Sequence, residues 1–450
     1  MRTHVRIIRT STEGGTDVMD YSQEPHGLFF MIDNKSFYAS VESVERGLNP
    51  LESVIVVMSE ADNTGSGLVL AASPMAKKLF GISNVSRQYE VPRDPRILVV
   101  PPRMNLYIRK NLLINRIFRD YVADADLFPY SIDESILDMT KSWHLFGETP
   151  EAVARLIQVR IRQELGLYTT VGIGENPTQA KLALDLQAKH DHELIGRLTY
   201  ADFPEYIWPI TDLTKVWSIG HRTATHLNRL GIHSMGDLAH VNPYALQQEM
   251  GIIGGQLFAL SWGIDRSQLA QIHPAKEKSW SNSQVLPRDY HQQQAIELVL
   301  REIAQQVIAR MRHHHQQTAC VSLSVGFAWD GKADDGRSGL HHTRRIEPTG
   351  NAQTIIRELV TLFREHWSGQ AVRNLAVGLS RLSASGHVQL DLFQKPQRQL
   401  KDDRFDRLID ELRDRFGTTA VIPASSLLPG GTMLSRAALV GGHNGGNSYD

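Results

Sequence analysis

The sequence predicts a multidomain protein of the α+β class, and three observations support this. The chain has 450 residues, too many for a single hydrophobic core, which indicates two to four domains. Short apolar runs of strand length alternate with longer segments of helical periodicity in its first part. The same mixture returns near the end, after a stretch from Tyr200 to about Gly263 that is typical of several short helices.

The first predicted element is a buried strand over residues 27–32, because this apolar run is too short to form a helix core. It leads directly to Asp33. A helix over residues 37–46 follows, in which apolar side chains recur at helical spacing. The same criteria predict the other elements of the first part, which are strands at 53–58, 65–72, 96–100 and 169–173, two short strands around a turn within 130–139, and helices at 74–80, 104–120, 150–164 and 178–189.

A second α+β region is predicted from residue 279 onward. Its expected elements are strands at 321–329 and 371–382 and helices at 292–312, 354–367 and 402–416. The glycine-rich end is expected to lack order from Gly441 onward. Basic side chains outnumber acidic ones between residues 276 and 395, although the net charge of the chain is -1. A local basic face of this kind is what a nucleic-acid-binding domain needs.

Composition excludes several classes of protein. Apolar residues make up 41% and charged residues 22% of the chain, which is ordinary for a globular protein. Cys320 is the only cysteine, so an intrachain disulfide and cysteine-based zinc sites are excluded. No apolar run approaches the roughly eighteen residues of a membrane span. Residues 1–26 are polar and lack the apolar segment of a secretory signal. We therefore expect a cytoplasmic protein that does not enter a membrane.

Two adjacent acids, Asp133 and Glu134, lie within the apolar segment 130–138. On a regular strand they would face opposite sides, and one would be buried without a partner. A turn between two strands allows both to point to one side. Neighbouring carboxylates repel each other unless a cation lies between them, and Mg²⁺ prefers oxygen ligands. Together with Asp33, these carboxylates can hold two Mg²⁺ ions that stabilise an in-line displacement at phosphorus.

Two segments resemble the first two motifs of Y-family DNA polymerases. Met31-Ile32-Asp33, followed by Phe37 to Glu42, is similar to the first motif, and Ser131-Ile132-Asp133-Glu134 is similar to the second. The resemblance runs from about Gly27 to Phe393. It is closest to the UmuC branch, the type of the DNA polymerase V catalytic subunit, with its relatives in Gram-positive bacteria. It implies an error-prone, template-directed DNA polymerase that performs translesion synthesis by adding dNTPs to the 3′-hydroxyl of a primer.

The resemblance also implies a right-handed arrangement of palm, fingers and helical thumb, with a further DNA-binding domain called the little finger. The corresponding boundaries are an N-terminal extension at 1–26, the palm at 27–36 and 100–188, the fingers at 37–99, the thumb at 189–265, the little finger at 276–388, a clamp-binding motif at 389–393, and a C-terminal helix with a flexible tail at 394–450.

The family's metal and sugar contacts carry over to specific positions of this chain. Asp33 and Asp133 are expected to bridge the two metal ions, and Glu134 to hold the catalytic one. The backbone carbonyl of Asn34 is expected to join the ion on the nucleotide side. Tyr38, preceded by Phe37, matches the steric gate, an aromatic ring that would clash with a ribose 2′-hydroxyl.

The expected triphosphate contacts match the family only in part. Lys181 corresponds to a palm lysine that reaches the triphosphate. The family also has a Tyr-x-x-Arg pair in the fingers, but here the tyrosine is absent and Lys77 or Lys78 takes the place of the arginine. A lysine is a point charge and lacks the bidentate fork of arginine.

Residues 216–224 resemble a helix-hairpin-helix, although Ser218 replaces its usual first glycine. Gly220 is expected to permit the tight turn. Arg222 and Thr223 then open a helix whose free N–H groups point at a DNA phosphate. Such contacts position the duplex without reading its sequence. In the last α+β region, the predicted phosphate contacts are Lys278, Arg344, Arg345 and Arg373.

The final predicted motif matches the segment that binds the bacterial sliding clamp. It comprises Gln389, Leu390, Asp391, Leu392 and Phe393, in which the glutamine offers an amide and the apolar side chains fill a hydrophobic pocket. The expected partners are therefore primer–template DNA, dNTP and the clamp's β subunit. The resemblance adds UmuD-like or recombinase accessory proteins as candidate partners.

Two alternative functions would not need all of these residues. A catalytically inactive, clamp-tethered DNA-binding protein of polymerase descent would not need intact Asp33, Asp133 and Glu134. A different nucleotidyl transferase, such as a cyclase, would not need the helix-hairpin-helix or the clamp motif. The sequence therefore favours the polymerase.

Overall fold

The computed structural model describes residues 19–60, 67–271, 278–329, 331, 336–385 and 396–445. The chain divides into two compact units. The first comprises Met1–Ser53, Ser73–Met75 and Tyr107–Ile272, and the second comprises Val54–Ala72, Ala76–Leu106 and His273–Asp450. Both units contain helices and sheets, which confirms the predicted α+β class. Within the described ranges, the helices are all too short or too polar to cross a membrane.

A five-stranded sheet in the order β5-β6-β1-β7-β8 forms the centre of the first unit. Strand β1 pairs antiparallel with both β6 and β7, and β7 pairs in parallel with β8. Every residue of β1 except Asp33 is buried, as the continuous apolar run predicted. The bounds are β1 Phe29–Asn34, β5 Leu127–Pro129, β6 Glu134–Asp138, β7 Thr169–Gly174 and β8 Ile195–Leu198.

Helices α5 Pro150–Leu165 and α6 Pro177–Ala183 pack against this sheet. Helix α4 Met104–Phe118 is joined to β6 by the Ser135 hydroxyl, which donates to Asn115 at 3.2 Å, and α1 Phe37–Val44 follows β1 in the chain. The helix predicted over 178–189 is in fact α6 followed by a π-helical turn over Leu184–Ala188, because five residues are too few for the periodicity to separate the two helix types. Gly172 of β7 permits this packing, since a Cβ there would lie 2.1 Å from the carbonyl oxygen of Ala180. Short 3₁₀ turns span Asp124–Asp126 and Trp143–Leu145.

Short helices complete the first unit, as predicted for residues 200–263. They are 3₁₀ turns at Tyr200–Asp202 and Leu213–Lys215, a π turn at Phe203–Ile207, and helices α7 His221–Arg229, α8 Met235–His240, α9 Pro243–Met250 and α10 Ile252–Ser261. Their buried side chains share one apolar cluster, which includes Phe203 and Leu227. Met19, which precedes β1, also packs into this cluster.

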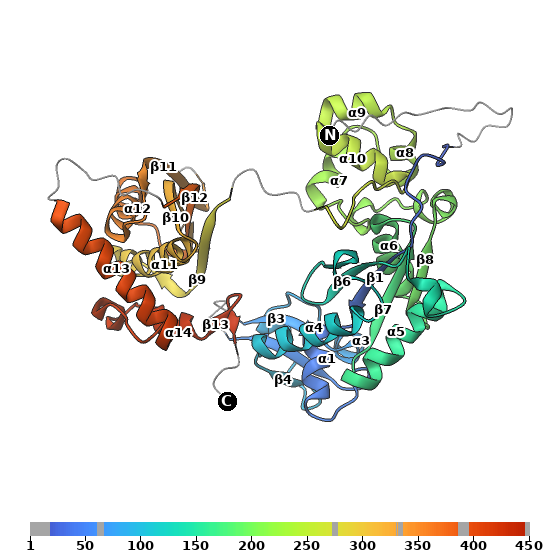
Figure 1. The fold of residues 1–450 in the computed structure, drawn as a ribbon, viewed down its shortest axis with the longest axis horizontal. Coiled ribbons are helices and arrows are strands. Elements are labelled where there is room, and N and C mark those ends of the chain that lie inside the picture. The colour runs from blue at the N-terminus through green and yellow to red at the C-terminus, as the bar shows by residue number, and fades with distance from the viewer. Residues whose placement is uncertain are drawn as a thin grey trace. The chain divides into compact units, whose positions relative to one another are not determined.

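Two sheets belong to the second unit. The smaller one has the order β3-β2-β4, with β2 Ile55–Ser59, β3 Leu68–Ala72, β4 Leu98–Val100, helix α3 Pro74–Phe80 and a 3₁₀ turn at Gln88–Glu90. The larger one has the order β11-β10-β12-β9. Its elements are β9 Trp280–Tyr290, α11 Gln293–His313, β10 Gln316–Phe327, β11 Gly339–Thr349, α12 Ala352–His366 and β12 Val372–Ala384. Helices α11 and α12 pack on the larger sheet around one apolar cluster (Figure 1).

The C-terminal segment packs on the larger sheet's domain. It comprises α13 Pro396–Phe416, a 3₁₀ turn at Ala424–Leu427, α14 Met433–Ala437, and the short strands β13 Leu439–Val440 and β14 His443–Asn444. Arg312 of α11 donates to Asp406 at 3.0 Å and to Asp410 at 2.7 Å, which joins α11 to α13. The prediction that order ends at Gly441 is wrong through residue 445. Gly441 and Gly442 have φ of 60° and 85° and form the turn of the β13–β14 hairpin, a conformation that glycine adopts readily.

Candidate metal and nucleotide site

The three predicted metal carboxylates lie near one another, where β1 ends and β6 begins. Asp33, the second-last residue of β1, pairs in register with Glu134, the first residue of β6. Asp133 lies in the turn that precedes β6, so the predicted turn between two strands is confirmed. Asn34 holds this turn, because its backbone N–H and its side-chain amide both donate to the carbonyl oxygen of Asp133 at 2.9 Å.

The position of Asp33 is unfavourable for its own negative charge. Burial raises the pKa of the Asp33 carboxyl from its ordinary value of 3.8 to about 6, and the charges of Asp133 and Glu134 act in the same direction. Lys189 and Lys181 oppose this rise in the pKa. A carboxylate placed in this way is stabilised by any cation that binds beside it.

Two lysines provide positive charge at this site. The Lys181 ammonium lies 2.6 Å from Glu134 Oε1 and 3.2 Å from Asp185 Oδ2. Lys189 lies 2.7 Å from Asp185 Oδ1, and although burial lowers its pKa, the charges of Asp33 and Asp185 raise that pKa overall. Sequence reasoning identified Lys181 but missed Lys189. The spacing of Lys181, Asp185 and Lys189, four residues apart along a helix, was the signal that could have found it.

The donor set of this site fits a hard divalent cation. Among the described residues, no group of three His, Cys, Asp or Glu side chains is already arranged around a metal position. Glu134 is turned toward Lys181, and Asp133 Oδ1 accepts from the Ser131 hydroxyl at 2.8 Å. Nevertheless, three carboxylates lie at neighbouring strand ends and Asn34 Oδ1 is buried without a hydrogen-bond partner in the described part of the chain. Oxygen donors with excess negative charge are what Mg²⁺ takes.

Tyr38, the predicted steric gate, follows Phe37 at the start of α1. Its ring stacks on that of Tyr107 in α4, with centroids 4.4 Å apart and planes inclined by 14°. Burial raises the pKa of the Tyr38 hydroxyl, and the charge of Asp133 raises it further. The aromatic side chain therefore lies within electrostatic range of the carboxylate turn.

The predicted triphosphate lysines of α3 lie in a different part of the fold. Lys77 and Lys78 are both exposed, and they belong to the second unit. Lys181 belongs to the first unit and contacts two carboxylates. The roles of all three lysines toward a triphosphate remain predictions.

The predicted helix-hairpin-helix forms a turn followed by α7, but the residue with the left-handed backbone conformation is not the predicted one. Ser218 has a left-handed φ of 76°, whereas Gly220 is the N-cap of α7 with a φ of −85°, a value open to any residue. A Cβ at Gly220 would meet no described atom within 4 Å. Ser218 therefore makes the turn expected of Gly220. Arg222 is exposed and Thr223 half-buried in the first turn of α7.

The predicted phosphate contacts of the second unit do not share one face. Arg344 donates to Glu358 of α12 at 3.3 Å and also contacts Glu365, so it lies on the helix side of the larger sheet. Arg345 is exposed, and as the next residue of strand β11 it points to the opposite side. Arg373 donates to Asp289 at 2.9 Å. Lys278 is exposed immediately before β9, and residues 389–393 lie outside the described residues.

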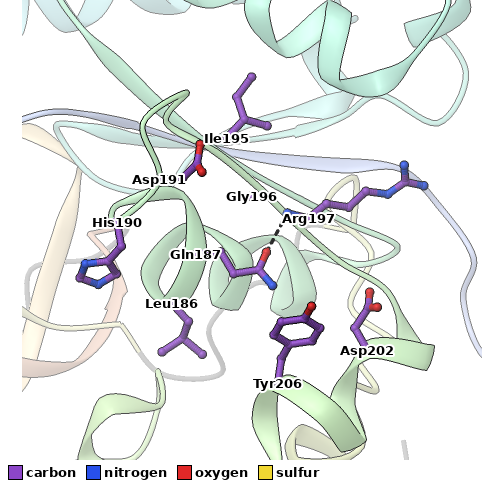
Figure 2. Close-up of a pocket in the computed structure, with 9 residues that line it drawn as sticks. All are labelled: Leu186, Gln187, His190, Asp191, Ile195, Gly196, Arg197, Asp202 and Tyr206. Atoms are coloured by element: carbon purple, nitrogen blue, oxygen red, sulfur yellow. Dashed lines mark hydrogen bonds between the residues drawn. The ribbon is translucent and has the colours of Figure 1, made fainter.

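A cavity of about 530 Å³ lies in the first unit, beside the π-helical turn and β8. Figure 2 shows its polar lining and the hydrogen bond between the Gln187 side chain and the backbone N–H of Arg197. Its lining residues are Leu186, Gln187, His190, Asp191, Ile195, Gly196, Arg197, Asp202 and Tyr206. The carboxylates and lysines of the candidate site are not among them, so the cavity does not mark that site.

Comparison with protein families gave three matches. The impB/mucB/samB family matches residues 32–185, and the C-terminal domain of the same family matches residues 277–392. The helix-hairpin-helix motif of this family matches residues 200–232. The first two matches span the carboxylate site and the larger sheet of the second unit.

Several curated proteins are similar over nearly the whole chain. A putative UV-damage repair protein UvrX of Bacillus subtilis is 40% identical, over 95% of this chain and 100% of that protein. A DNA polymerase IV 2 of the same organism is 37% identical, over 92% of this chain and 98% of that protein. A DNA polymerase IV of Moorella thermoacetica is 36% identical, over 90% and 97%. Among solved structures, a Y-family DNA polymerase chimera superposes with a TM-score of 0.63 at 20% identity, covering 79% of this chain and 99% of that one.

Proposed function

Because the chain belongs to the impB/mucB/samB family of Y-family DNA polymerases, we propose that it is an error-prone enzyme that copies damaged templates by two-metal nucleotidyl transfer. It is a DNA-directed DNA polymerase of the translesion type. Beyond this, we propose the low fidelity, the metal mechanism and the partners of the enzyme. The observation that carries it is the meeting of Asp33, Asp133 and Glu134 at the paired ends of β1 and β6.

Each residue of the site has its own role in the proposed reaction. Two Mg²⁺ ions, when bound, polarise the primer 3′-hydroxyl and stabilise the charge that develops on the α-phosphate and the leaving pyrophosphate. Asp33, Asp133 and Glu134 would hold these ions, and the backbone carbonyl of Asn34 would be a further ligand. Lys181, which contacts Glu134 at 2.6 Å, would supply positive charge to the triphosphate.

Mg²⁺-dependent primer extension tests this mechanism. Asp133→Ala should abolish extension and leave primer–template binding nearly unchanged, because it removes a metal ligand and no DNA contact. The matched control is Asp138→Ala, at the opposite end of β6, which should retain extension. Extension by Asp133→Ala near the wild-type rate would remove Asp133 from the metal site. A wild-type protein that binds DNA and extends no primer would instead support the inactive DNA-binding protein.

We also propose that Tyr38 excludes ribonucleotides. Its position in the first turn of α1, four residues after Asn34, supports this role. Tyr38→Ala should admit ribonucleotides, because the smaller side chain leaves room for a 2′-hydroxyl. Single-nucleotide incorporation of matched dNTP and rNTP measures this, and unchanged sugar selectivity would reject the assignment.

We propose for the DNA-holding parts the domain bounds that were predicted from the sequence. We assign residues 27–36 and 100–188 to the palm, 37–99 to the fingers, 189–265 to the thumb and 276–388 to the little finger. The uncapped start of α7 supports a phosphate contact in the thumb, since Gly220 supplies no side-chain hydrogen bond to the helix within the described residues.

Residues 389–393 are proposed to bind the sliding clamp. The sequence motif supports this, together with its place at the end of the match to the family's C-terminal domain, which runs to residue 392. Deletion of the five residues should weaken clamp binding without changing extension in the absence of clamp. An unchanged affinity for the isolated β subunit, measured by surface plasmon resonance, would contradict the proposal. Primer extension on damaged templates with and without UmuD-like or recombinase proteins would show whether the enzyme depends on accessory partners.

A further inference from the structure

Helix α1 carries a fully buried carboxylate one turn after Tyr38. Glu42 is 0% exposed, and a buried acid is rare unless its charge is paired and hydrogen-bonded. It is not one of the three proposed metal carboxylates, and it lies in α1, nine residues after Asp33. Its burial therefore needs a reason other than metal binding.

Both carboxylate oxygens of Glu42 are engaged. The Tyr107 hydroxyl of α4 donates to Oε1 at 2.8 Å. The Arg46 guanidinium contacts Oε2 and also donates to the Glu42 backbone carbonyl at 2.9 Å. Hydrogen bonds to a charged group are stronger than neutral ones, and their loss inside a protein is costly. Glu42 thus holds the Tyr107 hydroxyl in one place.

Tyr107 connects this anchor to the predicted sugar gate. Its side chain is 0% exposed, and its ring stacks nearly parallel on the ring of Tyr38, at a centroid distance of 4.4 Å. The ring of Phe37 stands edge-on to it at 6.5 Å. One face of Tyr38 is therefore covered by a ring whose hydroxyl is hydrogen-bonded to the buried Glu42.

We propose that Glu42 and Tyr107 are positioning residues for sugar selection, which hold the Tyr38 ring where a 2′-hydroxyl would clash with it. The inference rests on the proposed role of Tyr38 as the steric gate. Steric exclusion works only while the excluding ring stays in place, and a displacement of about 1 Å at a reacting site is enough to change rates substantially. Neither residue needs to touch the nucleotide to act in this way.

A purely structural role makes a different prediction. If Glu42 and Tyr107 only tied α1 to α4, their loss would lower the incorporation of dNTP and rNTP by the same factor. A positioning role instead changes the ratio of the two kcat/KM values. The dNTP reaction should be nearly unaffected, while the KM for rNTP falls toward that for dNTP.

Three variants test the Glu42–Tyr107 contact and the Tyr107–Tyr38 contact separately. Tyr107→Phe keeps the stacked ring and loses only the hydroxyl, Tyr107→Leu loses the ring as well, and Glu42→Gln keeps an acceptor oxygen but loses the charge. Single-nucleotide incorporation of dATP and ATP opposite template thymine is measured for each. Discrimination against ATP should fall several-fold in Tyr107→Phe and Glu42→Gln, and about tenfold in Tyr107→Leu, the size expected for one aromatic contact.

The matched control removes a different tyrosine hydroxyl of the same unit. Tyr121 lies just after α4, its ring packs on Phe146, and its side chain contacts Arg160. Tyr121→Phe should leave discrimination at the wild-type value. Circular dichroism checks that each variant is folded, and Tyr107→Phe, which is nearly isosteric, provides a test if Glu42→Gln does not fold.

The outcomes distinguish this inference from the function it rests on. Relaxed discrimination in Tyr38→Ala together with the three variants supports it. Relaxed discrimination in Tyr38→Ala alone, with wild-type ratios in Tyr107→Phe, Tyr107→Leu and Glu42→Gln, overturns it while the gate stands. Unchanged discrimination in Tyr38→Ala overturns both the gate and this inference, and polymerase activity on dNTP remains as evidence for the enzyme itself.

Discussion

Substitution of Asp33 by asparagine should abolish catalysis and yet stabilise the metal-free protein. The pKa of the Asp33 carboxyl is raised from 3.8 to about 6, first because the group is buried. This difference corresponds to about 3 kcal/mol between the protonated and ionised forms. An asparagine has nearly the same shape and never carries the charge, so Asp33→Asn removes this cost from the folded state.

The pH dependence of this effect follows from the direction of the shift. Because the folded-state pKa lies above that of the unfolded chain, the stability that protonated Asp33 contributes is fully present below pH 3.8. It is lost as the pH rises through about 6. At neutral pH and without metal, Asp33→Asn should therefore exceed the wild type in stability by about 3 kcal/mol, and the advantage should shrink toward zero in acid.

Hydrogen exchange of the amides of β1 and β6 measures the stability of the first unit directly, since these central strands open late. Wild type and variant are compared at the same pH in a chelator, so that the intrinsic exchange rates cancel. Added Mg²⁺ should stabilise the wild type and leave Asp33→Asn nearly unchanged. A variant that is no more stable than the wild type at neutral pH, or whose advantage persists in acid, would refute the electrostatic account of Asp33.

Three further predictions concern charged contacts. Lys181→Gln should tighten Mg²⁺ binding in the absence of nucleotide by about tenfold, because the Lys181 ammonium lies 2.6 Å from Glu134 in the wild type. Calorimetric titration measures the Mg²⁺ affinity, and an unchanged affinity would contradict the prediction. We expect DNA to contact the side of β11 that carries the exposed Arg345, so Arg345→Ala should lower the salt dependence of DNA binding by about one phosphate contact. Arg344→Ala, on the helix side of β11, should not, and equal slopes in both variants would refute this choice of side. Arg312→Gln should weaken the attachment of α13 by roughly 2 kcal/mol, and unaltered exchange of the α13 amides would argue against this.

The buried strand β1 and the turn that precedes β6 were predictable because both depend on local sequence. The apolar run that ends at Asp33 identifies β1, and the two adjacent acids in an apolar segment require the turn that holds Asp133. Helix α5 is also encoded locally, by its apolar periodicity, its Thr149 N-cap and the left-handed Gly166 at its end. Each of these features is decided by residues within one or two turns of each other.

The end of the chain shows where composition misleads. Glycines predict disorder when only their flexibility is considered. The same flexibility permits the tight turn at Gly441 and Gly442 once a docked segment makes that turn favourable. Whether a glycine-rich stretch is ordered thus depends on what it contacts, here the start of α4, where the backbone N–H of Asn105 donates to the carbonyl oxygen of Gly445 at 3.0 Å.

By itself, the sequence determined the family, the fold class and the three carboxylates, since motifs and periodicities are written in neighbouring residues. Only the tertiary structure decided which charges of the candidate site are paired and how the ring of Tyr38 is held. Lys181 contacts Glu134, which lies 47 positions away in the chain, and Tyr107 contacts Glu42, which lies 65 positions away. Such contacts, like the raised pKa of Asp33, arise from burial by the whole fold. No local pattern specifies which distant side chains that burial brings together.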